Sequence, residues 1–536
     1  MVKKEILLGG LIDEGEKDDK QKKNTNTAVE VNEPSKPKDL DNILSESVGK
    51  FGLFQVWLVT ILFFCQATFA TGVYTSVFTD YTPKHHCVRE GGEDTFNLSR
   101  WEAESERCNL ILDENMTECS RWTFDQTVIR HSASSEFGIV CDNAFLKTLS
   151  GTLKMSGLLV GSFVFGWMSD VLGRVPSLTL AGILLFISQI IAGFSTNYIM
   201  FSVMNIFMAA GGIGSYLISF VLLFEWISPE YRTKASASAQ VPFALGFLYT
   251  VFIAWQISSW RPLQFALAAP NAVFLVFFFI VPESPRWLVS QRKYGKAIKS
   301  IRIAAKSNKL PAPEQEIQEN TESNENFGIG VLVAHPVLRY RLIIMSCNWI
   351  VVTLCFYGLI LNSADQDLFI GMSSSAAVEL LAYILTIFMM DIFGRRPILT
   401  ICQIVSGCCC ICAGFVPQDF FWLRLFFSSI GKMGASAVFS VIFVYTSELF
   451  PTCVRNSAMG LCSTVARIGA MLAPSIAGLD SVLAMLPFLV MGGAAVMAGC
   501  LSFALPETRG TILPETLEQA EAIGAGKSVA NIKNKL

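Results

Sequence analysis

Charged residues are scarce in this chain, and their scarcity is the first constraint on its class. Only 16% of the 536 residues are Asp, Glu, Lys or Arg, against about 25% in an average soluble domain. Hydrophobic residues make up 52%, and this balance favours a membrane protein. The net charge of −3 is uninformative about partners, and nothing in the sequence suggests nucleic-acid binding.

Two further absences narrow the function. The chain has only four histidines, all outside the stretches predicted below to cross a membrane, and no nucleophile stands beside a base in a recognisable arrangement. We therefore expect no enzyme and no cofactor. The first apolar run begins near Gly52, behind a lysine-rich tail, which is too late and too polar a start for a cleaved signal peptide. Residues 1–50 are predicted to form a cytosolic tail.

The apolar residues gather into twelve stretches of about 20 residues, the length that a membrane-spanning helix needs. Six lie on each side of the hydrophilic segment 282–340. The predicted fold is an all-α membrane protein with two six-helix bundles, 51–281 and 341–505, and a cytosolic tail, 506–536. The predicted spans are 52–74, 148–169, 175–194, 199–224, 235–257, 262–281, 342–361, 370–390, 397–416, 421–446, 457–478 and 483–504.

The distribution of charge among the loops predicts the orientation. An even number of spans places both termini on one side, and the positive-inside rule makes that side cytosolic, because the opposite short loops carry little more than Arg261 and Arg424. The long segment 75–147 is then extracellular. Its two sequons, at Asn97 and Asn115, are glycosylated only outside the cytosol, which agrees with this orientation.

The same segment holds four cysteines, an even number in an oxidising compartment, which predicts two disulfides. Four cysteines permit three pairings, and the sequence does not choose among them. A metal site with His85 and His86 as further ligands is the less favoured alternative, because the spacings are wide. The cysteines are Cys87, Cys108, Cys119 and Cys141.

Three charged motifs occur twice in the same order, about 222 residues apart. Asp-x-x-Gly-Arg at 170–174 returns at 391–395, and Pro-Glu-Ser-Pro-Arg at 282–286 returns as Pro-Glu-Thr-Arg at 506–509. Between them, a glutamate followed by a proline and an arginine is also repeated. This repetition indicates a duplicated membrane unit, of the kind that holds a substrate between its halves near the bilayer midplane.

The repeated charges lie at predicted cytosolic helix ends, where water can solvate them. Exposed ion pairs are worth only about 0–1 kcal/mol each, which suits contacts that form and break in every transport cycle. We expect one gating network in each half, which controls conformation and does not touch substrate. Its residues are Asp170, Arg174, Glu225, Arg232, Glu283 and Arg286 in the first half, and Asp391, Arg395, Glu448, Arg455, Glu507 and Arg509 in the second.

Between the halves, residues 289–309 combine helical spacing with several lysines and arginines. This pattern predicts an amphipathic cytosolic helix lying along anionic lipid headgroups. A polar, acidic linker, Pro311–Asn326, follows it.

These motifs resemble those of the major facilitator superfamily and, within it, solute carrier family 22, the organic cation, organic anion and carnitine transporters. The likeness rests on the Asp-x-x-Gly-Arg repeat, the long cysteine-bearing first loop, and the stretches Ser135–Cys141, Pro282–Leu288 and Tyr445–Pro451. It runs from about Val48 to about Ala520. The resemblance implies a plasma-membrane carrier in which two six-helix bundles give alternating access to a midplane site.

Three charges lie deep inside predicted spans of the second half: Glu379 in the eighth, Lys432 in the tenth and Arg467 in the eleventh. A charge at the bilayer midplane costs roughly 2.5–3.5 kcal/mol on insertion scales, so each is a candidate substrate ligand. A structural salt bridge between them is the alternative.

The family resemblance implies which part of a substrate two of these charged residues bind. Anion and carnitine carriers of the family have an arginine at the position of Arg467, and cation and carnitine carriers keep an acid at the position of Glu379. Both signs together imply a zwitterion, with its carboxylate on Arg467 and its ammonium near Glu379. Aromatic rings would complete the cationic end, although each ring alone has packing as its alternative. The candidates are Tyr216, Phe243, Trp349, Phe356 and Tyr357.

Lys154, in the second predicted span, replaces an uncharged residue that is common in the family. The favoured expectation is that it snorkels outward to the headgroups. If it faces the cavity instead, it adds positive potential and favours anionic substrates.

The sequence thus predicts a transporter of small organic ions. Carnitine- or betaine-like zwitterions come first, organic anions second and organic cations third. A non-transporting receptor is the last alternative, disfavoured because both halves carry the gating motifs. Coupling to sodium or protons, exchange of solutes and facilitated diffusion all remain open.

Overall fold

The computed structural model describes the chain between residues 44 and 523. The chain divides into two units, Met1–Lys38 and Asp39–Leu536, and every described residue belongs to the second. Residues outside the description are 1–43, 45, 50, 89–95, 103–107, 113–114, 120, 229–230, 232–234, 236–237, 312–328, 418, 512–513, 515–516 and 524–536. Most of the predicted tail 1–50, and Arg232 of the predicted gating set, therefore lie outside it.

The first half is built from six apolar segments that run alternately in opposite directions. The sixth is not one helix, because Pro270 cannot donate a backbone hydrogen bond and a 3₁₀ turn interrupts the segment there. The segments are α2 (Leu53–Thr79), α6 (Phe145–Leu172), α7 (Arg174–Gly193), α8 (Tyr198–Trp226), α10 (Val241–Gln256), and α11 (Trp260–Ala268) with η2 (Ala269–Val273) and α12 (Phe274–Ile280).

The second half repeats this plan. Each half has one spanning helix whose start is fixed by a side-chain cap: the side chain of Asn197 accepts from the backbone of Met200 before α8, and Asp367 does the same for Ile370 before α17. The helices are α16 (Pro336–Gln366), α17 (Leu368–Phe393), α18 (Arg395–Phe415), α19 (Phe421–Leu449), α20 (Thr452–Ala477), with η3 (Gly478–Ser481), and α21 (Leu486–Ser502).

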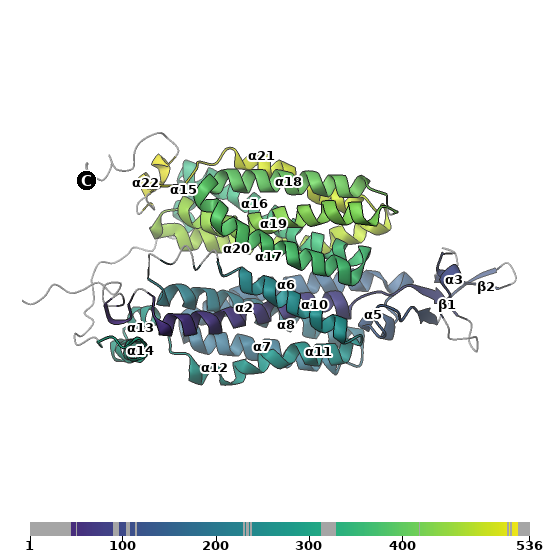
Figure 1. The fold of residues 1–536 in the computed structure, drawn as a ribbon, viewed down its shortest axis with the longest axis horizontal. Coiled ribbons are helices and arrows are strands. Elements are labelled where there is room, and N and C mark those ends of the chain that lie inside the picture. Colours follow the sequence, from purple (N-terminus) through teal and green to yellow (C-terminus); the bar gives the residue numbers. More distant parts are fainter. Residues whose placement is uncertain are drawn as a thin grey trace, which may run out of the picture. The chain divides into compact units, whose positions relative to one another are not determined.

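Ten helical segments among the described residues are long and apolar enough to cross a membrane, and α10 and α21 are shorter apolar helices. Together they supply the twelve predicted spans, so the predicted all-α membrane fold is confirmed. Figure 1 shows the first-half helices, purple to teal, beside the second-half helices, green to yellow. Large apolar side chains stay exposed on the outer faces, as lipid contact requires: Phe279 is 83% exposed and Ile199 77%.

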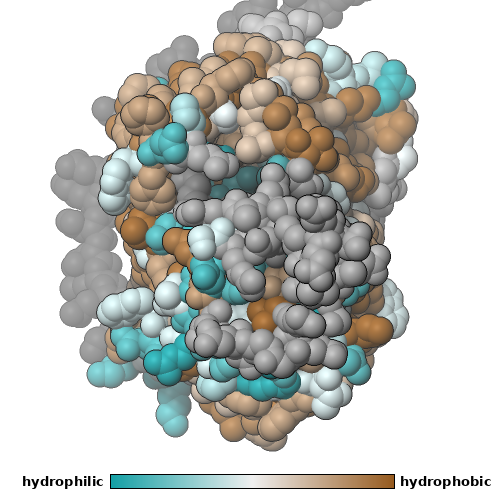
Figure 2. Space-filling model, turned by 90° about the vertical axis from the view of Figure 1, so that its right-hand side faces the viewer, coloured by the Kyte–Doolittle hydropathy of each residue, from teal (hydrophilic) through white to brown (hydrophobic). Residues whose placement is uncertain are grey.

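We name the two ends of the helices by what they carry. The loop end carries residues 80–144, with α3 (Leu98–Glu102), α5 (Ala133–Glu136), η1 (Cys141–Asn143) and two antiparallel strand pairs. Strand β1 (His85–Cys87) pairs with β4 (Trp122–Phe124), and β2 (Asn109–Leu112) with β3 (Asn115–Glu118). In the view onto this end, brown apolar residues occupy much of the upper and right-hand margins, and teal hydrophilic residues gather toward the lower left (Figure 2).

The motif end carries the repeated charged motifs and four short helices. Two belong to the first half, α13 (Pro285–Ser290) and α14 (Tyr294–Asn308), and two to the second, α15 (Ile329–Ala334) and α22 (Leu517–Ala522). The guanidinium of Arg341 donates to the carbonyls of Ala520 and Ile523, both at 2.6 Å, and so attaches the end of α22 to α16.

The buried core differs between the two ends. Toward the loop end, one continuous cluster contains residues of both halves, among them Phe243 and Phe356, whose ring centres lie 6.4 Å apart. Toward the motif end, the clusters are separate, one around Leu58 and Trp226 and the other around Trp349 and Tyr445. The halves are therefore joined by packing at the loop end and have independent cores at the motif end.

Candidate functional site

The first motif network holds three helix ends together. Arg174 reaches across to α8, where its Nη2 lies 2.9 Å and its Nε 3.1 Å from Oε1 of Glu225. Its Nη1 also pairs with Asp170 at 2.7 Å, one turn earlier in the chain. The Nε of Arg286 donates to the carbonyl of Glu225. A single arginine thus links α6, α7 and α8.

A glutamate from the chain after α12 caps the start of α7. Glu283 accepts from the backbone N–H groups of Arg174 and Val175, which are unpaired donors at a helix N-terminus. Burial raises the pKa of the Glu283 carboxyl above its usual range, although these backbone donors oppose the shift. Gly173 makes the approach possible: it has φ +113°, and a Cβ there would collide with Oε2 of Glu283.

The second half builds the same network with its own residues. Arg395 lies 2.9 Å from Glu448, and Glu507 accepts from the backbone of Arg395 and Arg396, both at 3.0 Å. Gly394, at φ +91°, again leaves the space for the glutamate. The ion pairs Arg174–Glu225 and Arg395–Glu448 each lie within one half.

The remaining predicted gating residues are Arg455, Arg509 and Asp391, and the two arginines each contact a backbone carbonyl. Arg455 approaches the carbonyl of Phe450 through its Nε, and Arg509 donates to the carbonyl of Ile392. Asp391 is exposed and has no ion pair or hydrogen bond with any residue that the structure describes. This separates it from Asp170, its counterpart in the first half.

Asp391 instead lines a cavity of about 570 Å³ at the motif end. One wall is formed by the start of α2 and the segment before α10, and the other by α17, α18 and α19. The lining is mostly apolar and comes from both halves. Its residues are Phe51, Val59, Phe63, Ile227, Tyr231, Ala235, Ser238, Ile387, Phe388, Met390, Asp391, Arg395 and Val444.

Two of the three predicted midplane charges form a pair. The Nζ of Lys432 lies 2.9 Å from Oε2 of Glu379, and neither side chain is exposed. The same ammonium stands 3.2 Å above the centre of the Phe356 ring. The hydroxyl of Tyr383 donates to Oε1 of Glu379 at 3.3 Å. The acid and the base therefore neutralise each other inside the protein.

The third midplane charge, Arg467, has no ion-pair partner among the residues that the structure describes. Arg467 is 7% exposed, and it makes no ion pair with a described residue, while its Nε lacks a hydrogen-bond acceptor. The hydroxyls of Tyr357 and Tyr216 are the titratable groups near enough to interact with it electrostatically. A buried guanidinium without an anion is costly, so this position is suited to receive one.

Aromatic side chains from both halves lie around these charges. In the first half, the ring centres of Phe243 and Tyr216 lie 6.4 Å apart, and in the second half those of Phe356 and Tyr357 lie 5.3 Å apart. Trp349 lies elsewhere: its Nε1 donates to Thr446 at 3.0 Å within the motif-end core.

Two aromatic residues at the site escaped the sequence reasoning. Tyr74 stacks on Phe247 with ring centres 3.7 Å apart and interacts electrostatically with Glu379. Tyr383 stands four residues after Glu379, so helical spacing could have identified it. No comparable signal in the sequence points to Tyr74.

Lys154 is neither at the headgroups nor available to a substrate. It is 3% exposed, and its ammonium donates to the carbonyls of Gly72 and Val73, at 3.0 and 2.8 Å, and to the hydroxyl of Ser76 at 2.7 Å. These contacts use all three of its donors. The expectation that Lys154 snorkels outward is therefore wrong, because nearby α2 acceptors solvate the charge internally.

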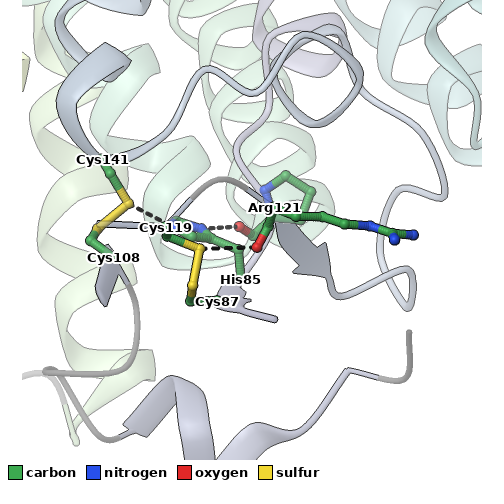
Figure 3. The surroundings of a disulfide bond; sticks show 7 residues. His85, Cys87, Cys108, Cys119, Arg121 and Cys141 are labelled. Carbon is green, nitrogen blue, oxygen red and sulfur yellow. Dashed lines mark hydrogen bonds between the residues drawn. A yellow bond between two sulfur atoms is a disulfide. The ribbon is translucent and has the colours of Figure 1, made fainter. Parts of the chain in front are cut away.

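The loop-end cysteines form two disulfides, Cys87–Cys119 and Cys108–Cys141. Figure 3 shows His85 beside them, with its Nε2 4.0 Å from the sulfur of Cys141. Since both nearby sulfurs are in a disulfide, the group formed by His85, Cys108 and Cys141 does not offer two thiolates to a metal. Asn97 is exposed, and its side chain accepts from the hydroxyl of Ser99 at 2.6 Å. The side chain of Asn115 lies outside the described atoms.

Two helical halves joined at one end, with mirrored motif networks and a charged midplane site, define a membrane transporter of the major facilitator type. The family model "Sugar (and other) transporter" matches residues 123–520. The chain is 31% identical to the organic cation transporter protein of Drosophila melanogaster, over 90% of this chain and 95% of that one.

Human solute carrier family 22 member 13 is 33% identical, over 89% and 92% of the two chains. A structure of the xylose transporter XylE from E. coli matches the fold with a TM-score of 0.58 at 17% identity, covering 85% of this chain and 99% of that one. The chain therefore belongs to solute carrier family 22 of the major facilitator superfamily. It is a multi-pass membrane transporter and not an enzyme.

Proposed function

We propose that this protein carries small organic ions with a carboxylate group across the plasma membrane, and that Arg467 binds that carboxylate. The observation that carries the proposal is the imbalance of the midplane charges. The opposite charges of Glu379 and Lys432 neutralise each other, whereas the buried positive charge of Arg467 has no counter-ion among the described residues. Arginine cannot be neutralised by losing its proton, and its planar fork can bind a carboxylate through two hydrogen bonds.

A betaine- or carnitine-like zwitterion is the first candidate. Its carboxylate would neutralise Arg467, and its quaternary ammonium would rest against the rings of Tyr216, Tyr357 and Phe243, where a cation gains about 0.5–2 kcal/mol. This differs from the expectation that Glu379 holds the ammonium, because Lys432 already occupies that carboxylate.

Organic anions come second. Their carboxylate also neutralises Arg467, but they have no ammonium group, so the aromatic rings make only apolar contacts with them. Some relatives are named organic cation transporters, among them one of Drosophila melanogaster and one of Caenorhabditis elegans. A purely cationic substrate would have to displace Lys432 from Glu379 while leaving Arg467 buried and unpaired. We therefore place cations third.

The two ends of the molecule support alternating access with the motif end cytosolic. At the loop end, Phe78 of α2 meets Phe369 of α17 at 6.0 Å, and the hydroxyls of Thr152 and Ser475 lie 3.4 Å apart. The cavity between the halves lies at the opposite end. This arrangement corresponds to a carrier closed outward and opening inward, with the two motif networks keeping each half rigid while the halves rock.

Uptake into expressing cells tests the proposal. Labelled carnitine, a labelled aromatic carboxylate and a labelled tetraalkylammonium ion are compared at equal concentration, with untransfected cells as control. We expect carnitine to enter fastest and the carboxylate next. Entry of the tetraalkylammonium ion alone would refute the role of Arg467.

A further inference from the structure

The surface of α14 carries basic side chains that the transport site does not use. Its sequence from Tyr294 to Asn308 contains no acidic residue. Lys296, Lys299, Arg302 and Lys306 are all exposed and make no ion pair with a described residue. At 100° per residue, they fall within about 120° of the helix circumference.

The opposite face of α14 is already covered by the protein. Ala297, Ile301 and Ala304 are fully buried and belong to the first-half core that also contains Trp287 and Phe54. The helix therefore does not insert its apolar face into a bilayer, contrary to the expectation for an amphipathic anchor. It is a fixed support that presents its charged face outward.

One exposed apolar side chain stands within the basic face. Ile303 is 49% exposed and, at 100° per residue, lies between Lys299 and Lys296 around the helix. Exposed aliphatic side chains among lysines and arginines are typical of surfaces at the headgroup boundary, where charge meets phosphate and the apolar group meets acyl chains.

The end of α14 is tied to the first spanning helix. The side chain of Asn308 accepts from the backbone N–H of Phe54 at 2.7 Å and donates to the carbonyl of Val48 at 2.6 Å and to the side chain of Gln55 at 2.8 Å. It thereby caps the start of α2, more than 250 residues away in the sequence. A displacement of α14 is therefore transmitted through Asn308 to α2, the helix that lines the motif-end cavity.

We propose that the exposed basic face of α14 binds the headgroups of anionic phospholipids in the leaflet at the motif end, and that Asn308 couples this contact to α2. This lipid contact rests on the proposed orientation in one respect only, namely which leaflet supplies the lipid. Binding can be measured without transport, so the two proposals fail separately.

The test uses the full-length protein in a neutral detergent, titrated with fluorescent short-chain phosphatidylserine. Each basic side chain near an anionic surface contributes similarly, so Lys299→Gln/Arg302→Gln/Lys306→Gln is expected to weaken binding on the order of 100-fold. The matched control, Lys84→Gln/Arg130→Gln/Arg339→Gln, removes the same charge from exposed positions outside α14 and should leave binding within about two-fold.

The proposal would be overturned if the triple variant bound phosphatidylserine as tightly as the parent protein does. It would also be overturned if phosphatidylcholine or inorganic phosphate competed as strongly as phosphatidylserine itself. The acidic linker after α14 is the rival occupant. Replacing its five glutamates by glutamine should leave the affinity for phosphatidylserine unchanged. A rise in that affinity of more than ten-fold would show that the linker occupies the basic face instead. These glutamates are Glu314, Glu316, Glu319, Glu322 and Glu325.

Discussion

The motif end and the midplane of this transporter use charge in opposite ways. At the motif end each half builds the same arginine–glutamate pair, with side chains 12–14% exposed and with equivalent partners. At the midplane the charges occur once, all in the second half, and one of them has no partner among the described residues. Duplication explains the first pattern, because it copied the scaffold. The unrepeated charges distinguish the two halves, and specificity belongs there.

The largest effect is expected from breaking the midplane pair. Lys432→Met leaves the carboxylate of Glu379 buried without its counter-charge, which should cost about 3–5 kcal/mol of stability. Thermal unfolding of the purified protein in detergent measures the loss. The double variant Glu379→Gln/Lys432→Met removes both charges and should recover most of it. A Lys432→Met protein as stable as the parent would show that the pair does not hold the two helices.

A smaller effect should appear equally in both halves when the motif glycines gain a side chain. Gly173→Ala and Gly394→Ala each place a methyl group against the capping glutamate at positive φ, and we expect each to cost about 1–3 kcal/mol. Gly166→Ala and Gly493→Ala are matched controls, since their added methyl meets nothing within 4 Å. Unequal losses at Gly173 and Gly394 would contradict the equivalence of the two networks.

The smallest expected effect is a difference in stability between variants of the two repeated aspartates, Asp170 and Asp391. Asp170→Asn removes an ion pair whose carboxylate is 76% exposed, worth about 0.3–0.5 kcal/mol. Asp391→Asn removes no ion pair or hydrogen bond with a described residue and should leave the unfolding temperature unchanged. If Asp391→Asn is the more destabilising change, the claim that Asp170 takes part in its network while Asp391 does not is wrong.

The sequence predicted most of the fold and part of the site. The duplicated motifs and the apolar runs were sufficient for twelve spans and two halves, because hydrophobic length and helix-end charge are local properties. The sequence also selected Glu379, Lys432 and Arg467, since a charge inside an apolar run is visible without a structure.

The partners of these charges could not be predicted in the same way. Which of Lys432 and Arg467 pairs with Glu379 depends on how α17, α19 and α20 pack, and no spacing along the chain encodes that. Lys154 illustrates the same limit: its fate depends on carbonyls of Gly72 and Val73, on another helix. The disulfide pairing was likewise one of three possibilities until the strands of the loop brought Cys87 to Cys119.

The most direct measurement of the central claim is carboxylate uptake by Arg467→Ala. Loss of a charged hydrogen-bonding partner should lower uptake of carnitine about 100-fold at unchanged surface expression, whereas Arg467→Lys, which keeps the charge but not the fork, should retain part of it. Surface biotinylation provides the expression control. Uptake by Arg467→Ala equal to that of the parent protein, at equal surface expression, would show that this arginine does not bind the substrate.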